Sequence, residues 1–182
     1  MAISILVLES YFRQTINWSE FVHNILKLAI VTILAAAFWS SSIVNAESGY
    51  AKQKVVYHIN YDNPKQHTGA LRNIQNHINA VGEENLDLKV VLHGNGLAML
   101  LEPDALSRVP KFKSASANDE IAAKIAGLKD QGVGFHVCAN TINGRKVDYQ
   151  ADLHDVSEED IVSSGVAEVA KLQAMGYSYI KP

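Results

Sequence analysis

The chain contains a single cysteine, Cys138, among its 182 residues. One thiol excludes an internal disulfide, and it excludes the paired-cysteine motifs that hold zinc or carry out disulfide exchange. A lone thiol in an oxidising compartment is either buried and inert, paired with another chain, or reactive. The location and the surroundings of Cys138 are therefore the main question that the sequence raises.

Neither sign of charge dominates, since 16 Lys and Arg face 19 Asp and Glu, for a formal net charge of −3. This balance lacks the basic footprint of a nucleic-acid-binding protein or of a protein that binds anionic membranes, so we expect no nucleic-acid partner. The sequence also contains no Gly-x-Ser-x-Gly elbow, and HGNGLAM matches neither the P-loop nor the dinucleotide fingerprint. With 48% apolar residues the composition is that of a globular protein.

The first 46 residues have the pattern of a secretory signal peptide. Lys27 precedes the apolar run Leu28–Trp39, and small residues follow at Val44–Ala46. This predicts export with cleavage after Ala46, which leaves residues 47–182 as a single domain that is periplasmic or secreted and not bound to a membrane. The run is shorter than the roughly 20 apolar residues of a membrane span. An uncleaved membrane anchor and a buried core helix are the alternatives.

The remaining chain alternates between strand and helix patterns. Runs rich in β-branched and aromatic residues predict strands at 54–61, 86–94, 132–138 and 177–180. Apolar residues at helical spacing predict helices that begin near Pro64 and Asn118 and end at Gly82 and Gly132, and a third helix that ends at Gly176 and whose start is ambiguous. Such alternation predicts an α/β fold of three layers with a mostly parallel sheet.

Other segments are less clear. GLAMLLEPD suggests a short apolar turn of helix, and residues 104–117, with Pro110 and several Ser and Lys, suggest a surface connection. Residues 145–155 are polar and hard to assign. Ser157–Asp160 resembles a helix capping box, but Ile161–Val162 would also suit a short strand.

Ligands of parallel α/β sheets bind beyond the carboxyl ends of the strands. The polar residues that fall there are His58, Asn60, His93, His136 and Cys138. Because side chains alternate along a strand, His136 and Cys138 share a face, and His136 could hold the thiol or accept its proton. Buried cysteine is also a common apolar filler, and strand histidines are often satisfied core residues. A zinc site built from the histidines and the thiol is a further alternative, although no short ligand spacing supports it.

Five segments together resemble the DsrE/DsrF-like family: VVYHINYD, ALRNIQNHINA, KVVLHGNGLAMLL, GVGFHVCANT and SSGVAEVAKLQAMGYSYIKP. The resemblance implies a three-layer domain with about five parallel strands, and it favours a strand at Ile161–Ser164. It also implies homotrimers or hexamers. In the sulfur-relay members of the family, a cysteine after a central strand carries sulfur as a persulfide to a partner protein, and Cys138 matches that position.

Two functions follow from this resemblance. In the first, Cys138 accepts and passes sulfur, without a cofactor or metal, between a donor and an acceptor protein; in the second, the protein is an oligomeric, non-enzymatic binder of small ligands with a structural thiol. The residues expected to support or line the Cys138 site are His136, Asn140, Thr141, His93, Gly94, Asn95, Gly96, His58 and Asn60. Export would separate Cys138 from the cytoplasmic partners of the known sulfur relays.

Overall fold

The computed structural model describes residues 19–20, 22–23, 25–27, 49–109 and 111–182. Chain contacts divide the protein into two units at Ala46, and the second unit is the folded domain treated below. The apolar run and the cleavage site expected after Ala46 lie outside the described residues, so the signal peptide stays a prediction. Among the helices described, none is both long enough and apolar enough to span a membrane.

The domain is built on one sheet of five strands, all of which pair in parallel. The strands are β1 (Gln53–Ile59), β2 (Leu86–Leu92), β3 (Gly134–Cys138), β4 (Ile161–Val162) and β5 (Ser178–Ile180). Their order across the sheet is β4-β3-β2-β1-β5. The chain therefore moves outward from β1 to β4 and then returns past β1 to add β5. This confirms the predicted α/β class.

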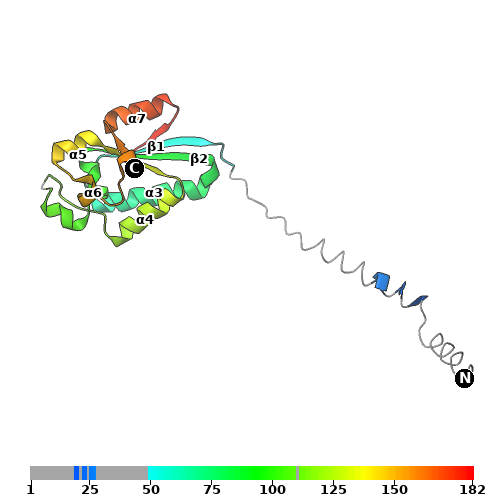
Figure 1. The fold of residues 1–182 in the computed structure, drawn as a ribbon. Coiled ribbons are helices and arrows are strands. Elements are labelled where there is room, and N and C mark those ends of the chain that lie inside the picture. Colours follow the sequence, from blue (N-terminus) through cyan, green and yellow to red (C-terminus); the bar gives the residue numbers. More distant parts are fainter. Residues whose placement is uncertain (1–18, 21, 24, 28–48, 110) are drawn as a thin grey trace, which may run out of the picture. The chain divides into compact units, whose positions relative to one another are not determined.

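Helices α3 (Pro64–Val81) and α4 (Asp119–Asp130) lie together on one face of the sheet (Figure 1). The side chains of Asn63 and Asn118 cap them, each accepting a hydrogen bond of 3.1 Å from a backbone amide of the first turn. Their apolar stripes pack on alternate residues of β1, β2 and β3 to form the larger core of the domain.

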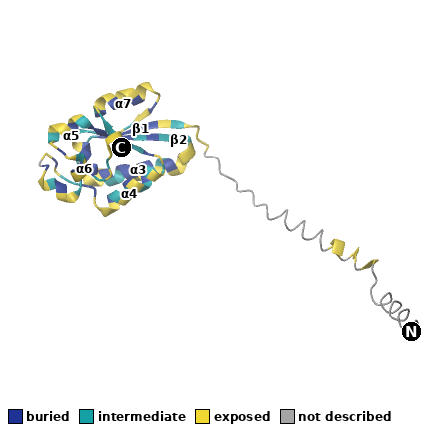
Figure 2. Ribbon diagram, viewed as in Figure 1, coloured by how far each residue is buried: buried dark blue, intermediate teal, exposed yellow. Residues whose placement is uncertain are grey.

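Helix α7 (Gly165–Ala174) covers the opposite face of the sheet (Figure 1). The connections from β1 to β4 all move across the sheet in one direction, whereas α7 connects β4 back to β5 in the opposite direction. Because crossovers between parallel strands are right-handed, this reversal places α7 on the other face of the sheet. The core beneath α7 is small and consists of Val56, Val91, Val169, Leu172 and Tyr177. Figure 2 shows exposed positions along the outer side of this helix, where Val166 is 64% exposed.

The prediction of a surface connection at residues 104–117 was wrong in part. The segment contains a 3₁₀ helix, η3 (Pro103–Ser107), and Ala105, Val109 and Phe112 are buried in the larger core. Proline and polar residues dominate its composition, but these three apolar side chains decide its packing. After β3 the chain forms α5 (Ala139–Arg145), and the polar stretch 145–155 that was hard to assign contains α6 (Tyr149–Asp152).

The capping box and the short strand that were considered for the segment before α7 are both present. Ser157 and Asp160 form a capping box around the 3₁₀ helix η4 (Glu158–Asp160), and Ile161–Val162 then forms β4. The apolar turn expected after β2 is the 3₁₀ helix η2 (Gly94–Met99), in which Leu97 and Met99 are fully buried. β4 pairs with Val137 and Cys138, the last two residues of β3.

Candidate functional site around Cys138

Cys138 is the last residue of β3 and the residue that precedes α5. It lies at the carboxyl end of a strand that is flanked by β2 and β4, where it pairs with Val162 of β4. Its exposed fraction is only 4%. The thiol is thus at the ligand-binding edge of the sheet but nearly closed off from solvent.

The sulfur of Cys138 is surrounded by hydrogen-bond donors. Burial raises the pKa of the thiol, but hydrogen bonds from its neighbours lower it by more, so that the net shift is downward. The donors are the backbone amides of Gly165, Thr141 and Asn140 and the hydroxyl of Thr141. Donors directed at a sulfur stabilise the thiolate, which is the nucleophilic form.

The hydroxyl of Thr141 joins the thiol to the loop after β2. Its oxygen accepts a hydrogen bond of 2.8 Å from the backbone amide of Gly94, and the same hydroxyl hydrogen bonds to Cys138. Thr141 is buried, and Gly94 adopts the left-handed region with φ of 55°. This link orients the hydroxyl proton toward the sulfur, because the amide occupies a lone pair of the oxygen.

Gly165, the first residue of α7, allows the helix to begin directly against the thiol. A β-carbon at this position would lie 2.7 Å from the β-carbon of His93 and 3.2 Å from that of Cys138. Only glycine leaves room for this approach, which brings the Gly165 amide to the sulfur. His93 and Cys138 are consequently neighbours on the α7 face of the sheet.

His136 lies on the α7 face, as strand alternation predicts, but its ring is held by another partner. Its Nδ1 is 3.1 Å from Oε1 of Glu168, a residue of α7 that is 7% exposed and also pairs with Lys171. Burial lowers the pKa of His136, and Glu168 opposes that shift. In the described part of the chain no hydrogen bond joins His136 to Cys138, so a direct role for His136 in holding the thiol has no contact to support it.

His58 and His93 form a pair at the ends of β1 and β2. Their Nε2 atoms are 2.6 Å apart, and Nδ1 of His58 is 2.8 Å from the hydroxyl of Tyr179 in β5. Burial, the neighbouring His93 and the charge of Lys181 lower the pKa of His58 to about 4. Burial and Lys181 also lower the pKa of His93. Both shifts favour the neutral form of the ring.

The remaining predicted lining residues have structural contacts. Oδ1 of Asn95 accepts a hydrogen bond of 2.6 Å from Arg145. A β-carbon on Gly96 would lie only 2.0 Å from the carbonyl oxygen of Ile59, so the η2 turn packs tightly against the end of β1. Asn60 follows β1 and is half-buried.

Comparison with known proteins decides the family. The model of the DsrE/DsrF-like family matches residues 53–182. The chain belongs to the DsrE/DsrF-like family. Among solved structures it is similar to MTH1491 from Methanobacterium thermoautotrophicum, described as a protein of unknown function, with 27% identity and a TM-score of 0.56 over 72% of this chain and all of that one. No curated protein matches the sequence.

Membership in the DsrE/DsrF-like family indicates a sulfur-relay role at the level of the family. Within residues 49–109 and 111–182, no three His, Cys, Asp or Glu side chains converge in a way that could hold a metal ion. The geometry gives the zinc alternative no support.

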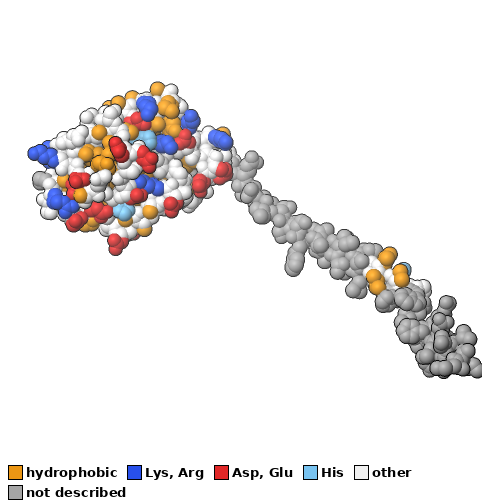
Figure 3. Space-filling model, viewed as in Figure 1, with side chains coloured by type: hydrophobic (Ala, Val, Ile, Leu, Met, Phe, Trp, Pro, Cys, Tyr) orange, Lys and Arg blue, Asp and Glu red, His pale blue; other side chains and the backbone are white. Residues whose placement is uncertain are grey.

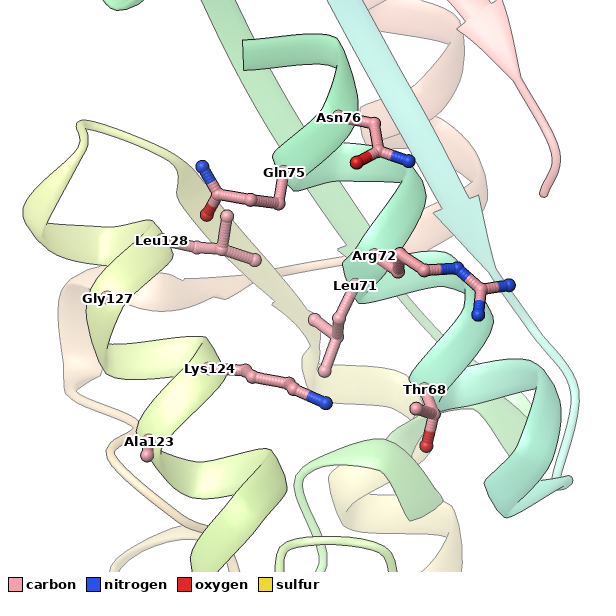
Figure 4. A pocket seen from close by; sticks show the side chains of 9 residues that line it. All are labelled: Thr68, Leu71, Arg72, Gln75, Asn76, Ala123, Lys124, Gly127 and Leu128. Atoms are coloured by element: carbon pink, nitrogen blue, oxygen red, sulfur yellow. The ribbon is translucent and has the colours of Figure 1, made fainter. Parts of the chain in front are cut away.

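A separate pocket of this DsrE-like domain lies between α3 and α4 and has a volume of about 400 Å³. Figure 4 shows side chains from both helices at its walls, among them Arg72, Gln75, Lys124 and Leu128. These helices cover the face of the sheet opposite to α7, whereas Cys138 contacts α7. The pocket is thus separated from the thiol by the sheet.

Three residues of the site were missed by the sequence reasoning: Gly165, Glu168 and Tyr179. Each comes from α7 or β5 and reaches the site only because the chain returns across the sheet. A glycine just after a serine at the start of a helix was a weak signal for close packing. The sequence contained no signal that would have paired Glu168 with His136 or Tyr179 with His58.

Proposed function

We propose that Cys138 accepts sulfur as a persulfide and passes it to an acceptor thiol. The observation that carries this proposal is the set of donors directed at the sulfur, which lowers the pKa of a thiol that burial alone would raise. A filler cysteine has no need of such a set, and free cysteines in apolar surroundings have raised pKa values. Family membership supplies the sulfur-relay context.

The proposed reaction is an exchange at sulfur. The Cys138 thiolate attacks the outer sulfur of a donor such as thiosulfate; a new S–S bond forms, the S–S bond of the donor breaks, and sulfite leaves with the electron pair. The amide groups of Gly165, Thr141 and Asn140 that stabilise the thiolate would also stabilise the persulfide anion, which carries the same charge. An acceptor thiolate then takes the outer sulfur and regenerates Cys138. No oxidant, cofactor or metal enters the sequence of steps.

The narrow access to the thiol favours a small donor. Since Cys138 is 4% exposed, a small inorganic anion can reach the sulfur after a slight movement of neighbouring side chains. A protein donor would need a larger opening.

Incubation of the full chain with thiosulfate, followed by intact-mass measurement, tests the proposal. The wild type should gain the mass of one sulfur atom, and the gain should be reversed by a reductant. Cys138→Ser is the matched control, because it keeps the size of the side chain and removes the nucleophile. Absence of the adduct on the wild type, or an equal adduct on the variant, would refute the proposal.

The alternative is an oligomeric binding protein with a structural thiol, and the 4% exposure of Cys138 favours it. If the thiol is structural, iodoacetamide should label Cys138 of the native protein no faster than the protein unfolds. The Cys138→Ala variant should then lose stability but keep its function. Labelling of the native protein at a rate above that of unfolding would exclude this alternative.

Assembly and location are further parts of the proposal. We expect homotrimers or hexamers, an encounter with a donor and an acceptor of sulfur, and export with cleavage after Ala46. Light scattering of the purified protein tests the assembly. Amino-terminal sequencing of the exported form tests the cleavage and should begin at Glu47; a form that begins at Met1 and stays with the membrane would indicate an uncleaved anchor.

A further inference from the structure

Tyr179, His58 and His93 form a continuous hydrogen-bonded chain across three strands. The Tyr179 hydroxyl is 2.8 Å from Nδ1 of His58, and Nε2 of His58 is 2.6 Å from Nε2 of His93. The centroids of the two imidazole rings are 4.7 Å apart and the ring planes differ by 24°. Because the facing nitrogens are much closer than the centroids, the rings meet edge to edge, as in a direct N–H···N hydrogen bond.

The contact is too short to accommodate a metal ion between the two rings. Zinc binds imidazole nitrogens at about 2.0 to 2.1 Å, so two such ligands lie roughly 3 Å or more from each other. A nitrogen separation of 2.6 Å instead requires that one nitrogen donates a proton and the other accepts it. The pair is a proton-sharing contact.

The sharing of one proton allows two arrangements of the neutral chain. A neutral imidazole has one N–H and one bare nitrogen. When Nε2 of His58 donates, Nδ1 of His58 accepts from Tyr179 and Nδ1 of His93 carries a proton. When Nε2 of His93 donates, Nδ1 of His93 is bare and Nδ1 of His58 donates to Tyr179. The two arrangements interconvert when each proton moves by one position, while one proton enters at one end of the series and another leaves at the other end.

One end of this hydrogen-bonded series of side chains lies near the Cys138 thiol, and the other end reaches the solvent. His93 and Cys138 both pack against Gly165, and Nδ1 of His93 has no hydrogen-bond partner among the described residues. At the other end, Tyr179 is 42% exposed. The chain thus joins the neighbourhood of the buried thiol to water.

We propose that Tyr179, His58 and His93 form a proton relay that carries the Cys138 proton to solvent and returns it. The relay rests on the proposed function of Cys138 as a sulfur acceptor. In the outward step the S–H bond of Cys138 breaks, and the proton moves to Nδ1 of His93, either directly or through a bridging water. The Nε2 proton of His93 moves to His58, the Nδ1 proton of His58 moves to the Tyr179 oxygen, and the Tyr179 proton enters water. Neither ring retains a charge.

The charges around the relay favour this neutral route. Lys181 acts on both rings and disfavours an imidazolium. The other ionisable groups that the structure places on this face form contacts of their own: His136 and Lys171 with Glu168, and Lys89 with Asp87. No carboxylate is hydrogen-bonded to His58 or His93 in the described part of the chain. A stable cation on either ring would therefore lack a counter-charge, whereas stepwise transfer through neutral rings needs none.

The relay is tested by the buffer dependence of sulfur uptake by the full chain. The variants are Tyr179→Phe, which keeps the ring and removes the hydroxyl, and His58→Asn, which removes the middle ring. In weakly buffered solution at pH 7 we expect both to take up sulfur about tenfold more slowly than the wild type, less than the roughly hundredfold or more of a lost direct general base. Added imidazole should restore their rates and leave that of the wild type unchanged. Tyr50→Phe, which changes a tyrosine that is 56% exposed, is the control and should behave as the wild type.

Rescue by imidazole separates a relay from a structural role, since a damaged fold is not repaired by a buffer. Wild-type rates in both variants, or slow rates that imidazole does not raise, would overturn the relay. If the wild type takes up no sulfur from thiosulfate, the proposed function is refuted, but the relay can still be tested.

The test is then the rate at which iodoacetamide alkylates Cys138 in the same buffers. Slower alkylation of Tyr179→Phe that added imidazole restores would support the relay, and equal rates in the variant and the wild type would overturn it.

Discussion

The two faces of the sheet differ in what they bury. The face beneath α3 and α4 holds a large, almost wholly apolar core, whereas the face beneath α7 holds an apolar core of five residues. Next to that small core lie the titratable groups of the site: Cys138, His58, His93, His136 and Glu168. The same three central strands supply both faces, because alternate residues point in opposite directions. The large core makes up most of the buried apolar surface, and the candidate site lies beside the small one.

The surface on and beside α7 exposes several large apolar side chains. Figure 3 shows positive and negative side chains interspersed on the visible face. On and beside α7, apolar side chains reach the surface: Val166, Met175 and Tyr179 are 64%, 53% and 42% exposed. A single short helix covers this face, and the side chains of His58, His93 and His136 beneath it are only partly buried.

Truncation of a core side chain should cost more on the α3 and α4 face than on the α7 face. Ile74 is fully buried and enclosed by helices and sheet, so Ile74→Ala should leave a cavity and lower the free energy of unfolding by about 4 kcal/mol. Leu172 is 3% exposed in the small core, where neighbours can relax, so Leu172→Ala should cost about 2 kcal/mol. Urea denaturation measures both. Equal costs would show that the two faces contribute alike to stability.

Gly165→Ala should damage the α7 face at the thiol itself. The new methyl group would lie 2.7 Å from the β-carbon of His93, which forces α7 outward, costs about 2 kcal/mol and weakens the amide contact to Cys138. The matched control is Gly127→Ala in α4, where a β-carbon meets nothing within 4 Å. The control should be neutral or gain up to about 1 kcal/mol. Thermal unfolding and sulfur uptake check both variants, and a stable, active Gly165→Ala protein would contradict the packing described here.

These variants also mark the limit of what the sequence could predict. Alternation and helical spacing predicted the sheet, the helices and the position of Cys138 at the end of a strand, because these depend on local patterns. The contacts of Gly165, Glu168 and Tyr179 depend on the return of the chain across the sheet. The hydrogen-bond partner of His136 is Glu168, 32 positions away in the sequence. Strand alternation had suggested Cys138, two residues away, as its partner.

Thr141→Val should raise the pKa of the Cys138 thiol, because the variant loses a hydroxyl that hydrogen bonds to the sulfur. It also leaves the Gly94 amide without its acceptor, at a cost of about 1 to 2 kcal/mol. The pH dependence of iodoacetamide labelling measures the pKa. Thr141→Ser keeps the hydroxyl and should retain the wild-type pH profile. An unchanged pH profile in Thr141→Val would show that the Thr141 hydroxyl does not affect the pKa of Cys138.

Acid should destabilise the α7 face through its histidines. The pKa of His58 falls from 6.5 to about 4 on folding, so the unfolded chain binds the proton more readily than the folded one. Stability is therefore full above pH 6.5 and is lost progressively as the pH falls toward 4. His58→Asn should reduce the loss of melting temperature between pH 7.5 and pH 5 relative to the wild type. A steeper loss in the variant would contradict the sign of the shift.

Cys138 lies at the edge of the face that only α7 covers, and we propose it as a sulfur acceptor. The most direct measurement is the intact mass of the full chain after incubation with thiosulfate, compared with that of Cys138→Ser treated in the same way. We expect one added sulfur atom on the wild type, removable by a reductant, and none on the variant. An unmodified wild type, or the same added mass on both proteins, would contradict it.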